Sequence, residues 1–181
     1  KAAERLVARS PKSAESLYRS LLDLDPGDFR TSLGLAVCYL RLNDVKRAES
    51  ILSRLVARTD SAHELDFERA LIIWAAVLQK QGQGDKAVIR LADFVNANPW
   101  KVEVRLALAS LYDHTGKRAQ ARALIEQGLE ANPGEAQLTA RKGTYYRQDG
   151  ALDMAGEYYR SALKSDRTNQ EAQQGLKELH Q

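Results

Sequence analysis

The chain has 181 residues, with 27 lysines and arginines against 24 aspartates and glutamates and a formal net charge of +3. Its 44% hydrophobic and 28% charged residues exclude a wholly disordered chain, and no run of about 18 apolar residues is present to span a membrane. A single cysteine excludes a disulfide scaffold and a cysteine-rich zinc module. With only four prolines, the composition favours helices.

Four columns of similar residues recur along the chain, which indicates an internal repeat. Alanine recurs at intervals of 34, 39, 34 and 34 residues, at Ala14, Ala48, Ala87, Ala121 and Ala155. A second small-residue column contains Ala36, Ala75, Ala109 and Gly143. Two bulky columns keep step with them, one at Tyr39, Leu78, Tyr112 and Tyr146 and the other at Tyr18, Leu52, Leu91, Ile125 and Tyr159. Small residues facing bulky ones at these spacings predict two closely packed antiparallel helices in each unit.

Turn signals and prolines divide the chain into units in the same register. Helix stops followed by helix starts occur at Asn43-Asp44, Gly82–Asp85, His114–Lys117 and Asp149-Gly150. We therefore expect a single array that consists of a partial unit at 1–28, full units at 29–62, 68–101, 102–135 and 136–169, and a capping helix at 170–181. Asn169 is the expected N-cap of that last helix. Because the partial unit lacks the start of its first helix, we expect the chain to be a fragment of a longer protein.

Residues 63–67 are five extra residues between the second and third units. Ser61 and Glu64 fit a capping box, in which each side chain satisfies a backbone N–H at the other position. We therefore expect the insertion to lengthen the following helix to 62–81, by about 7 Å at about 1.5 Å per residue. Residues 70–78 of this helix are apolar on every side, and such a helix is normally buried all round.

The columns resemble those of the tetratricopeptide repeat (TPR) family, which has small residues, alanine, an aromatic residue and a closing proline at the positions of Ala36, Ala48, Tyr39 and Pro99. The resemblance implies an all-α fold, a right-handed TPR superhelix (α-solenoid) of about four and a half helix hairpins plus a C-terminal capping helix. It also implies a scaffold that binds a peptide or amphipathic helix of a partner protein in a concave groove. Such scaffolds serve multi-protein assemblies, including those of bacterial secretion and envelope polysaccharide export. One departure is the column of the family's tryptophan, which reads Ser32, Leu71, Arg105 and Thr139.

In the family frame, the groove is apolar in its first half and rimmed by arginines. The residues expected to contact the partner are Arg30, Leu33, Val37, Arg41, Arg69, Ile72, Ile73, Ala76 and Arg141. The apolar residues would give contact area, and the arginines would orient acidic groups. Two interpretations of Ile72 and Ile73 stay open, since either the chain's own helices or a partner could bury them. An alternative partner is a second copy of the chain, in a homodimer through the apolar helix 62–81.

The sequence offers no set of residues with catalytic chemistry. His63, His114 and His180 fall in separate units without a second metal ligand at a suitable spacing. Cys38 lies among apolar residues in the middle of a helix, which predicts a buried, inert thiol. Asp113 is adjacent to His114, but no nucleophile accompanies them. We therefore expect no enzymatic activity, no cofactor and no metal.

An RNA-binding helical repeat is the third functional hypothesis. Acidic residues interrupt every basic stretch, and the inner positions are aliphatic where a base-reading code would be polar, which disfavours nucleic acid as the partner. The most basic cluster contains Arg41, Lys46, Arg47, Arg54 and Arg58. We expect it to be either a solvated face or a contact for an acidic protein segment. The sequence indicates no particular cellular compartment.

Overall fold

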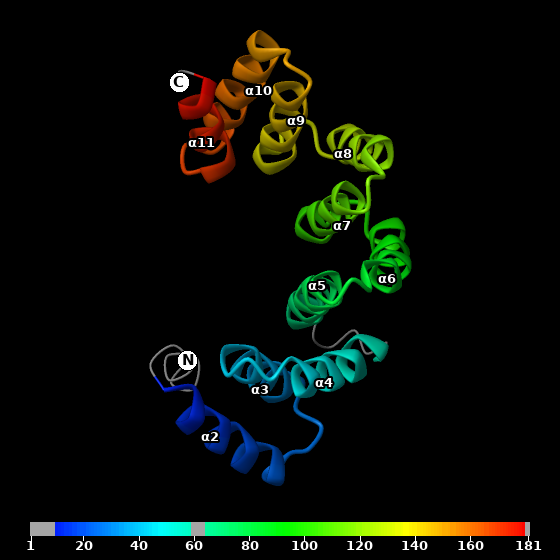
Figure 1. The fold of residues 1–181 in the computed structure, drawn as a ribbon, viewed down its shortest axis with the longest axis vertical. Coiled ribbons are helices and arrows are strands. Elements are labelled where there is room, and N and C mark those ends of the chain that lie inside the picture. Colours follow the sequence, from blue (N-terminus) through cyan, green and yellow to red (C-terminus); the bar gives the residue numbers. More distant parts are fainter. Residues whose placement is uncertain (1–9, 59–63, 180–181) are drawn as a thin grey trace. The chain divides into compact units, whose positions relative to one another are not determined.

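The structure is a computed structural model that describes residues 10–58 and 64–179 (Figure 1). These residues form ten α-helices: α2 (Pro11–Leu24), α3 (Phe29–Arg41), α4 (Val45–Ala57), α5 (Glu64–Lys80), α6 (Gly84–Ala97), α7 (Val102–His114), α8 (Arg118–Ala131), α9 (Ala136–Gln148), α10 (Leu152–Ser165) and α11 (Gln170–Leu179). The chain divides after Ala87 into two compact units.

In the first unit, each helix packs against the next one, from α2 through α3 and α4 to α5, and α3 also contacts α5. Residues of the small columns lie inside these contacts, and Ala14, Ala36 and Ala48 are each 0% exposed. Leu52 of the bulky column is also 0% exposed. The small-against-bulky pattern therefore marks the core of the hairpins, as the repeat predicts.

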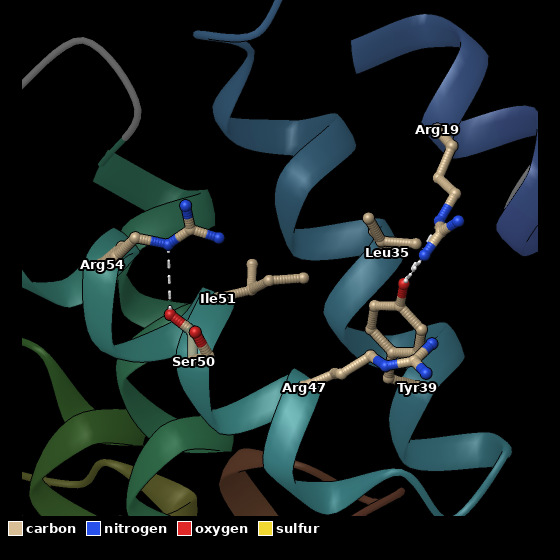
Figure 2. A pocket seen from close by; sticks show the side chains of 7 residues that line it. All are labelled: Arg19, Leu35, Tyr39, Arg47, Ser50, Ile51 and Arg54. Carbon is tan, nitrogen blue, oxygen red and sulfur yellow. Dashed lines mark hydrogen bonds between the residues drawn. The ribbon is translucent and has the colours of Figure 1, made fainter. Parts of the chain in front are cut away.

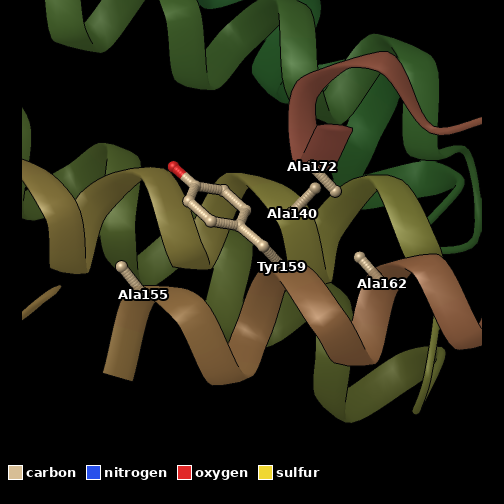
Figure 3. Packing of buried hydrophobic residues seen from close by; sticks show 5 residues of the cluster. All are labelled: Ala140, Ala155, Tyr159, Ala162 and Ala172. Atoms are coloured by element: carbon tan, nitrogen blue, oxygen red, sulfur yellow. The ribbon is translucent and has the colours of Figure 1, made fainter. Parts of the chain in front are cut away.

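In the second unit, α7 packs against α8, α8 against α9, α9 against α10 and α10 against α11, and α9 also contacts α11. Figure 3 shows the C-terminal part of this core, where the ring of Tyr159 lies among alanines of α9, α10 and α11. All of these residues are 0% exposed: Ala140, Ala155, Tyr159, Ala162 and Ala172. The short helix α11 therefore closes the core of the second unit.

The turn inside each hairpin has the same backbone geometry. The residue two positions past the first helix of the hairpin adopts a positive φ angle at Asn43, Gly82, Gly116 and Gly150. In each case, the next residue donates its backbone N–H to the carbonyl of the bulky column, as from Asp44 to Tyr39 and from Lys117 to Tyr112, both at 2.8 Å. This is the Schellman arrangement, in which a left-handed residue lets the chain reverse and satisfies the last helical carbonyls. Asparagine can replace glycine at position 43 because it tolerates this region better than other side chains.

Side-chain caps start four of the described helices, and at α9 the Glu135 side chain accepts a hydrogen bond from the Gln137 N–H at 3.3 Å. Asp28 accepts a hydrogen bond from the Thr31 N–H at 3.0 Å, and Asp44 accepts one from the Arg47 N–H at 3.1 Å. Asn169 accepts one from the Ala172 N–H at 2.9 Å, which confirms Asn169 as the N-cap of α11. These bonds satisfy backbone donors that have no partner within the helix.

Helix α5 is the longest of the described helices, with 17 residues where most have 13 or 14. The prediction that the inserted residues extend this helix is confirmed for the described part, Glu64–Lys80. The predicted capping box includes Ser61, which lies outside the described residues. The residues predicted as helical before position 10 and after position 179 also lie outside them. The division into five units of one continuous array stays a prediction.

Arg105 occupies the column in which the family has tryptophan, and it is a core residue. It is 3% exposed, and burial lowers its pKa. Its guanidinium donates to the Leu124 carbonyl at 3.0 Å and to the Pro99 carbonyl at 2.8 Å. Gly128 makes room for the side chain, since a Cβ there would lie 2.6 Å from Arg105 Cδ. Arg105 therefore joins α7 both to α8 and to the turn that precedes α7.

Candidate functional site

The predicted contact residues on α3 and α5 form a partly exposed face of the first unit. We call it the α3/α5 face; its members are Arg30, Val37, Arg41, Arg69, Ile72, Ile73 and Ala76. The aliphatic Val37, Ile72 and Ile73 are partly exposed, and Ala76 is exposed. All three arginines are exposed. The two helices contact each other, so their exposed residues can meet one partner.

Leu33 differs from the other predicted contact residues of the first unit. It is 3% exposed, so it packs inside the unit and offers little surface to a partner. Val37, one helical turn further along α3, carries the apolar surface of this helix instead. On α5, Ile72 and Ile73 are neither fully exposed nor fully buried, so the chain's own helices cover them only in part.

An ion pair links the beginnings of α3 and α5 at this face. Arg30 donates from Nε to Asp66 Oδ2 at 3.0 Å, and its Nη2 lies 3.0 Å from the same oxygen. The Asp66 side chain is 10% exposed and that of Arg30 is 75% exposed. The carboxylate is therefore held inside the unit, and most of the guanidinium faces solvent.

Two other arginines of the α3/α5 face have no side-chain partner among residues 10–58 and 64–179. Arg41 is the last residue of α3, and Arg69 lies in the second turn of α5. Without carboxylates to neutralise them, both guanidinium groups can bind acidic groups from outside the chain. The face therefore combines an aliphatic strip with a positive rim.

Two arginines of α9, in the second unit, are instead neutralised by α11. Arg141 donates from Nε to Glu171 Oε1 at 2.8 Å and from Nη1 to Ser110 Oγ at 3.3 Å. Arg147 lies 2.8 Å from Glu178. Burial is the largest single influence and lowers the pKa of Arg141, but the hydrogen bond and charge of Glu171 together with Tyr145 outweigh it, so the net shift is upward. Arg141 is thus already paired within the chain.

Asp113 and Arg122 form a polar cluster around Tyr145 in the same unit. The Tyr145 hydroxyl donates to Asp113 Oδ2 at 2.9 Å, and Arg122 lies over the Tyr145 ring at 5.2 Å. Burial, followed by the nearby Asp113 carboxylate, raises the pKa of Tyr145. Asp113 therefore accepts a structural hydrogen bond, and the cluster contains no nucleophile with a free base beside it.

The described residues contain no arrangement typical of a catalytic or metal centre. Burial, with a smaller effect of Glu15, raises the pKa of the Cys38 thiol to about 11, and Cys38 is 0% exposed. His114 bonds to the Ser110 carbonyl at 2.8 Å. No group of three or more metal-ligating side chains occurs in this part of the chain. The two other histidines, His63 and His180, lie outside it.

Sequence reasoning missed the carboxylates that pair with the groove arginines. Asp66 belongs to the inserted residues 63–67, and the 34-residue frame assigns that segment no position. Glu171 could have been found, because extending the frame by one unit places it at the same inner position as Arg30 and Arg69. The signal was the spacing of 34 residues from Gln137 to Glu171.

Comparisons with known proteins agree with the repeat pattern and the helix pairs. A family model described as tetratricopeptide repeat matches residues 6–65 and 78–141, and a second model of the same description matches 136–169. The chain belongs to the tetratricopeptide repeat family. No curated protein matches the sequence at a significant level.

Solved TPR structures share this fold over nearly the whole chain. TTC0263, a thermophilic TPR protein of Thermus thermophilus, is 23% identical with a TM-score of 0.71, and the match covers 99% of this chain and 97% of that one. YrrB, described as a TPR protein with an unusual peptide-binding site, is 20% identical with a TM-score of 0.60 over 97% and 88% of the two chains. MamA of Desulfovibrio magneticus RS-1 is 17% identical with a TM-score of 0.65 over 93% of each chain. At these identities, the matches show the fold alone.

The predicted all-α TPR fold is therefore confirmed, and the chain is a TPR protein-interaction module. TPR folds are typically non-catalytic. Among these residues, no helix combines the length and hydrophobicity that a membrane span requires.

Proposed function

We propose that the α3/α5 face binds a peptide or an amphipathic helix of a partner protein. The observation that carries this proposal is the partial exposure of Ile72 and Ile73 beside exposed Ala76, on a helix that contacts α3. Aliphatic side chains at these spacings present one continuous strip along α5. Contiguous apolar surface rimmed by polar residues is typical of protein-binding sites.

The charges of the face favour a partner with acidic side chains. Arg41 and Arg69 are exposed and have no partner among the described residues, and the guanidinium of Arg30 is largely exposed beside Asp66. Arginine binds carboxylates through two parallel hydrogen bonds, which fixes the orientation of the bound segment. We expect the partner to place apolar side chains on Ile72 and Ile73 and acidic ones near the arginines.

The size of the face sets the length of the bound segment. Helix α3 has 13 residues and α5 has 17, which correspond to about 20 Å and about 26 Å. An extended peptide advances about 3.3 Å per residue, so about six to eight residues would follow these helices. A bound helix that follows them would contact the face through about four to five turns.

Site-specific crosslinking tests this function in the full-length protein. A photoreactive p-benzoylphenylalanine replaces exposed Ala76 on the face, and a matched control places it at Ala123, an exposed position in the middle of α8. We expect a protein adduct from position 76 and none from 123. The crosslinked segment is then synthesised as a peptide and titrated by calorimetry against wild type, Ala76→Glu and the control Ala123→Glu.

Binding of that peptide should be lost in Ala76→Glu and unchanged in Ala123→Glu. Both substitutions are at exposed helical positions, so both variants should fold, as circular dichroism can verify. Equal crosslinking from positions 76 and 123, or unchanged affinity of Ala76→Glu, would refute the proposal. An adduct with a second copy of the chain would replace it with the homodimer, which light scattering at about 50 µM would detect.

A further inference from the structure

A second surface of the first unit has the geometry of a binding pocket. An open pocket of about 290 Å³ lies between α2, α3 and α4, lined by Arg19, Leu35, Tyr39, Arg47, Ile51 and Arg54 together with Ser50. On α3, Val37 and Arg41 lie within about 20° of Arg30 around the helix axis, whereas Leu35 and Tyr39 lie about 140° and 180° away. The pocket is therefore on the side of α3 opposite to the α3/α5 face.

The floor of the pocket is apolar and nearly buried. Leu35 is 6% exposed, Ile51 is 9% and Tyr39 is 4%. Figure 2 shows Leu35 and Ile51 between Arg54 on one side and Tyr39 with Arg19 and Arg47 on the other. A site of this size lies at the lower limit of ligand pockets, which are about 300–1,000 Å³, and suits one or two side chains of a larger partner.

The hydroxyl group of Tyr39 is prepared to donate a hydrogen bond. It accepts bonds from Arg19 Nη2 at 3.0 Å and from Arg19 Nε at 3.3 Å, and Arg47 lies over its ring at 5.3 Å. The described residues offer no acceptor for the hydroxyl hydrogen. An incoming carboxylate beside Tyr39 would therefore receive a phenol O–H bond strengthened by two adjacent guanidinium groups.

The charges around the pocket leave one arginine available. Glu15 lies 3.4 Å from Arg19 and 3.9 Å from Arg47, and Asp44 lies 3.1 Å from Arg47. Arg54 donates only from Nε, to the Ser50 carbonyl at 3.3 Å, and its terminal nitrogens have no partner within the described ranges. None of the lining residues is acidic. The pocket thus presents three guanidinium groups, flanked by the paired carboxylates of Glu15 and Asp44 and by the weaker charge of Asp23 on Arg19.

We propose that this pocket binds an acidic segment of a protein, with an aliphatic side chain on Leu35 and Ile51 and a neighbouring carboxylate between Arg54 and Tyr39. The apolar floor selects the aliphatic side chain, and the cationic rim with the phenol donor selects the carboxylate. The site is separate from the α3/α5 face, so one protein can hold two segments at once. It also gives a role to two members of the basic cluster, Arg47 and Arg54 of α4.

The test uses two synthetic peptides and nuclear magnetic resonance of the labelled protein. The probe is acetyl-Glu-Glu-Leu-Glu-Glu-amide, and its matched control is acetyl-Gln-Gln-Leu-Gln-Gln-amide. We expect the probe, titrated to about 5 mM, to shift the backbone amides of Tyr39, Ile51 and Arg54. The glutamine peptide, and a probe with alanine in place of leucine, should bind at least about fivefold more weakly.

Two charge-reversal variants distinguish binding of the probe in the pocket from nonspecific electrostatic attraction to the protein surface. Arg54→Glu should weaken binding of the probe about fivefold or more, whereas Lys46→Glu, an exposed change of the same charge on the same helix, should alter it less than about twofold. Ala76→Glu should leave it unchanged, which keeps this site distinct from the α3/α5 face. The inference is overturned if no amide shifts occur, if Lys46→Glu weakens binding equally, or if the shifts fall on α5 and vanish in Ala76→Glu.

Discussion

A glycine in the last helix gives the sharpest test of the packing. The Tyr159 ring is 0% exposed, and Gly175 of α11 and Gly143 of α9 both lie against it. A Cβ on Gly143 would lie 2.9 Å from two ring carbons, and a Cβ on Gly175 would overlap the ring more severely. The ring has little freedom to move, because its hydroxyl donates to Thr144 at 3.1 Å and accepts from Arg147 at 3.4 Å. We therefore predict that Gly175→Ala separates α11 from α10.

The expected loss of stability in Gly175→Ala can be estimated by comparison with a matched control in a neighbouring helix. Gly156 of α10 is also helical and buried, but a Cβ there would meet only the flexible Arg160 side chain, at 3.2 Å, and the tip of Leu179, at 3.5 Å. Replacing a helical glycine by alanine stabilises a protein by about 0.5–1 kcal/mol, and this term is common to both variants. Overpacking a rigid core costs about 1–3 kcal/mol, and this term applies to Gly175→Ala alone. The two free energies of unfolding should therefore differ by about 1–3 kcal/mol.

Urea denaturation followed by circular dichroism measures both variants against wild type. Hydrogen exchange of the α11 amides should additionally show local opening in Gly175→Ala, since terminal repeats can unfold separately. A double-mutant cycle with Tyr159→Leu should recover most of the overpacking cost, because leucine is shorter than the ring. Equal stability of Gly175→Ala and Gly156→Ala would refute the reasoning, since it would mean that the ring can move aside.

Three further predictions follow from buried or paired groups. Arg105→Ala should lower the free energy of unfolding by about 2–4 kcal/mol through a cavity and two unpaired carbonyls, whereas exposed Arg167→Ala should change it by less than about 0.5 kcal/mol in the same urea experiment. Cys38, with a pKa of about 11, should have only about 0.1% thiolate at about pH 8, so Ellman's reagent should react with it only after unfolding. The bond from Arg122, at 2.7 Å, lowers the pKa of the Asp149 carboxyl, so this pair stabilises the fold above the ordinary Asp pKa and is lost as the pH falls through the lowered value. Arg122→Gln should raise the pKa of Asp149 in a carbon-detected NMR titration, and an unchanged titration would exclude this cause.

The repeat pattern was sufficient to predict the helical hairpins because small and bulky columns have a direct steric meaning. Ala14, Ala48 and Ala87 recur where two backbones approach, and all three are 0% exposed. Asn43 and Gly82 recur where the chain must take a positive φ to reverse. In both cases the geometry at one position restricts the residue type allowed there, to a small residue in the core and to glycine or asparagine in the turn. Such a restriction is visible in a single sequence as a recurring residue type.

The state of the groove arginines could not be predicted in the same way. Arg30 and Arg69 are equivalent in the repeat frame, yet Arg30 pairs with Asp66 and Arg69 has no partner in the described part of the chain. Pairing depends on which side chain of the next helix lies opposite, and the insertion at 63–67 changes that register. The exposure of Ile72 and Ile73 likewise depends on how closely helices pack, which the apolar character of α5 does not specify.

One pair of columns links the core to the proposed binding face. The bulky column of the second helices reads Tyr18, Leu52, Leu91, Ile125 and Tyr159, and the sixth position of the following unit reads Gly34, Ile73, Ala107, Arg141 and Gly175. Both tyrosines are paired with glycine at this sixth position, Tyr18 with Gly34 and Tyr159 with Gly175. In both pairs the ring occupies the space where a Cβ would be, and a Cβ on Gly34 would lie 2.5 Å from Tyr18 Cζ. Where the second helix carries the shorter Leu52, the sixth position can hold a full side chain, Ile73. The size of the residue in the bulky column therefore determines whether the sixth position of the following unit can carry a side chain. Leucine at position 52 thus permits isoleucine at position 73, in the proposed binding face.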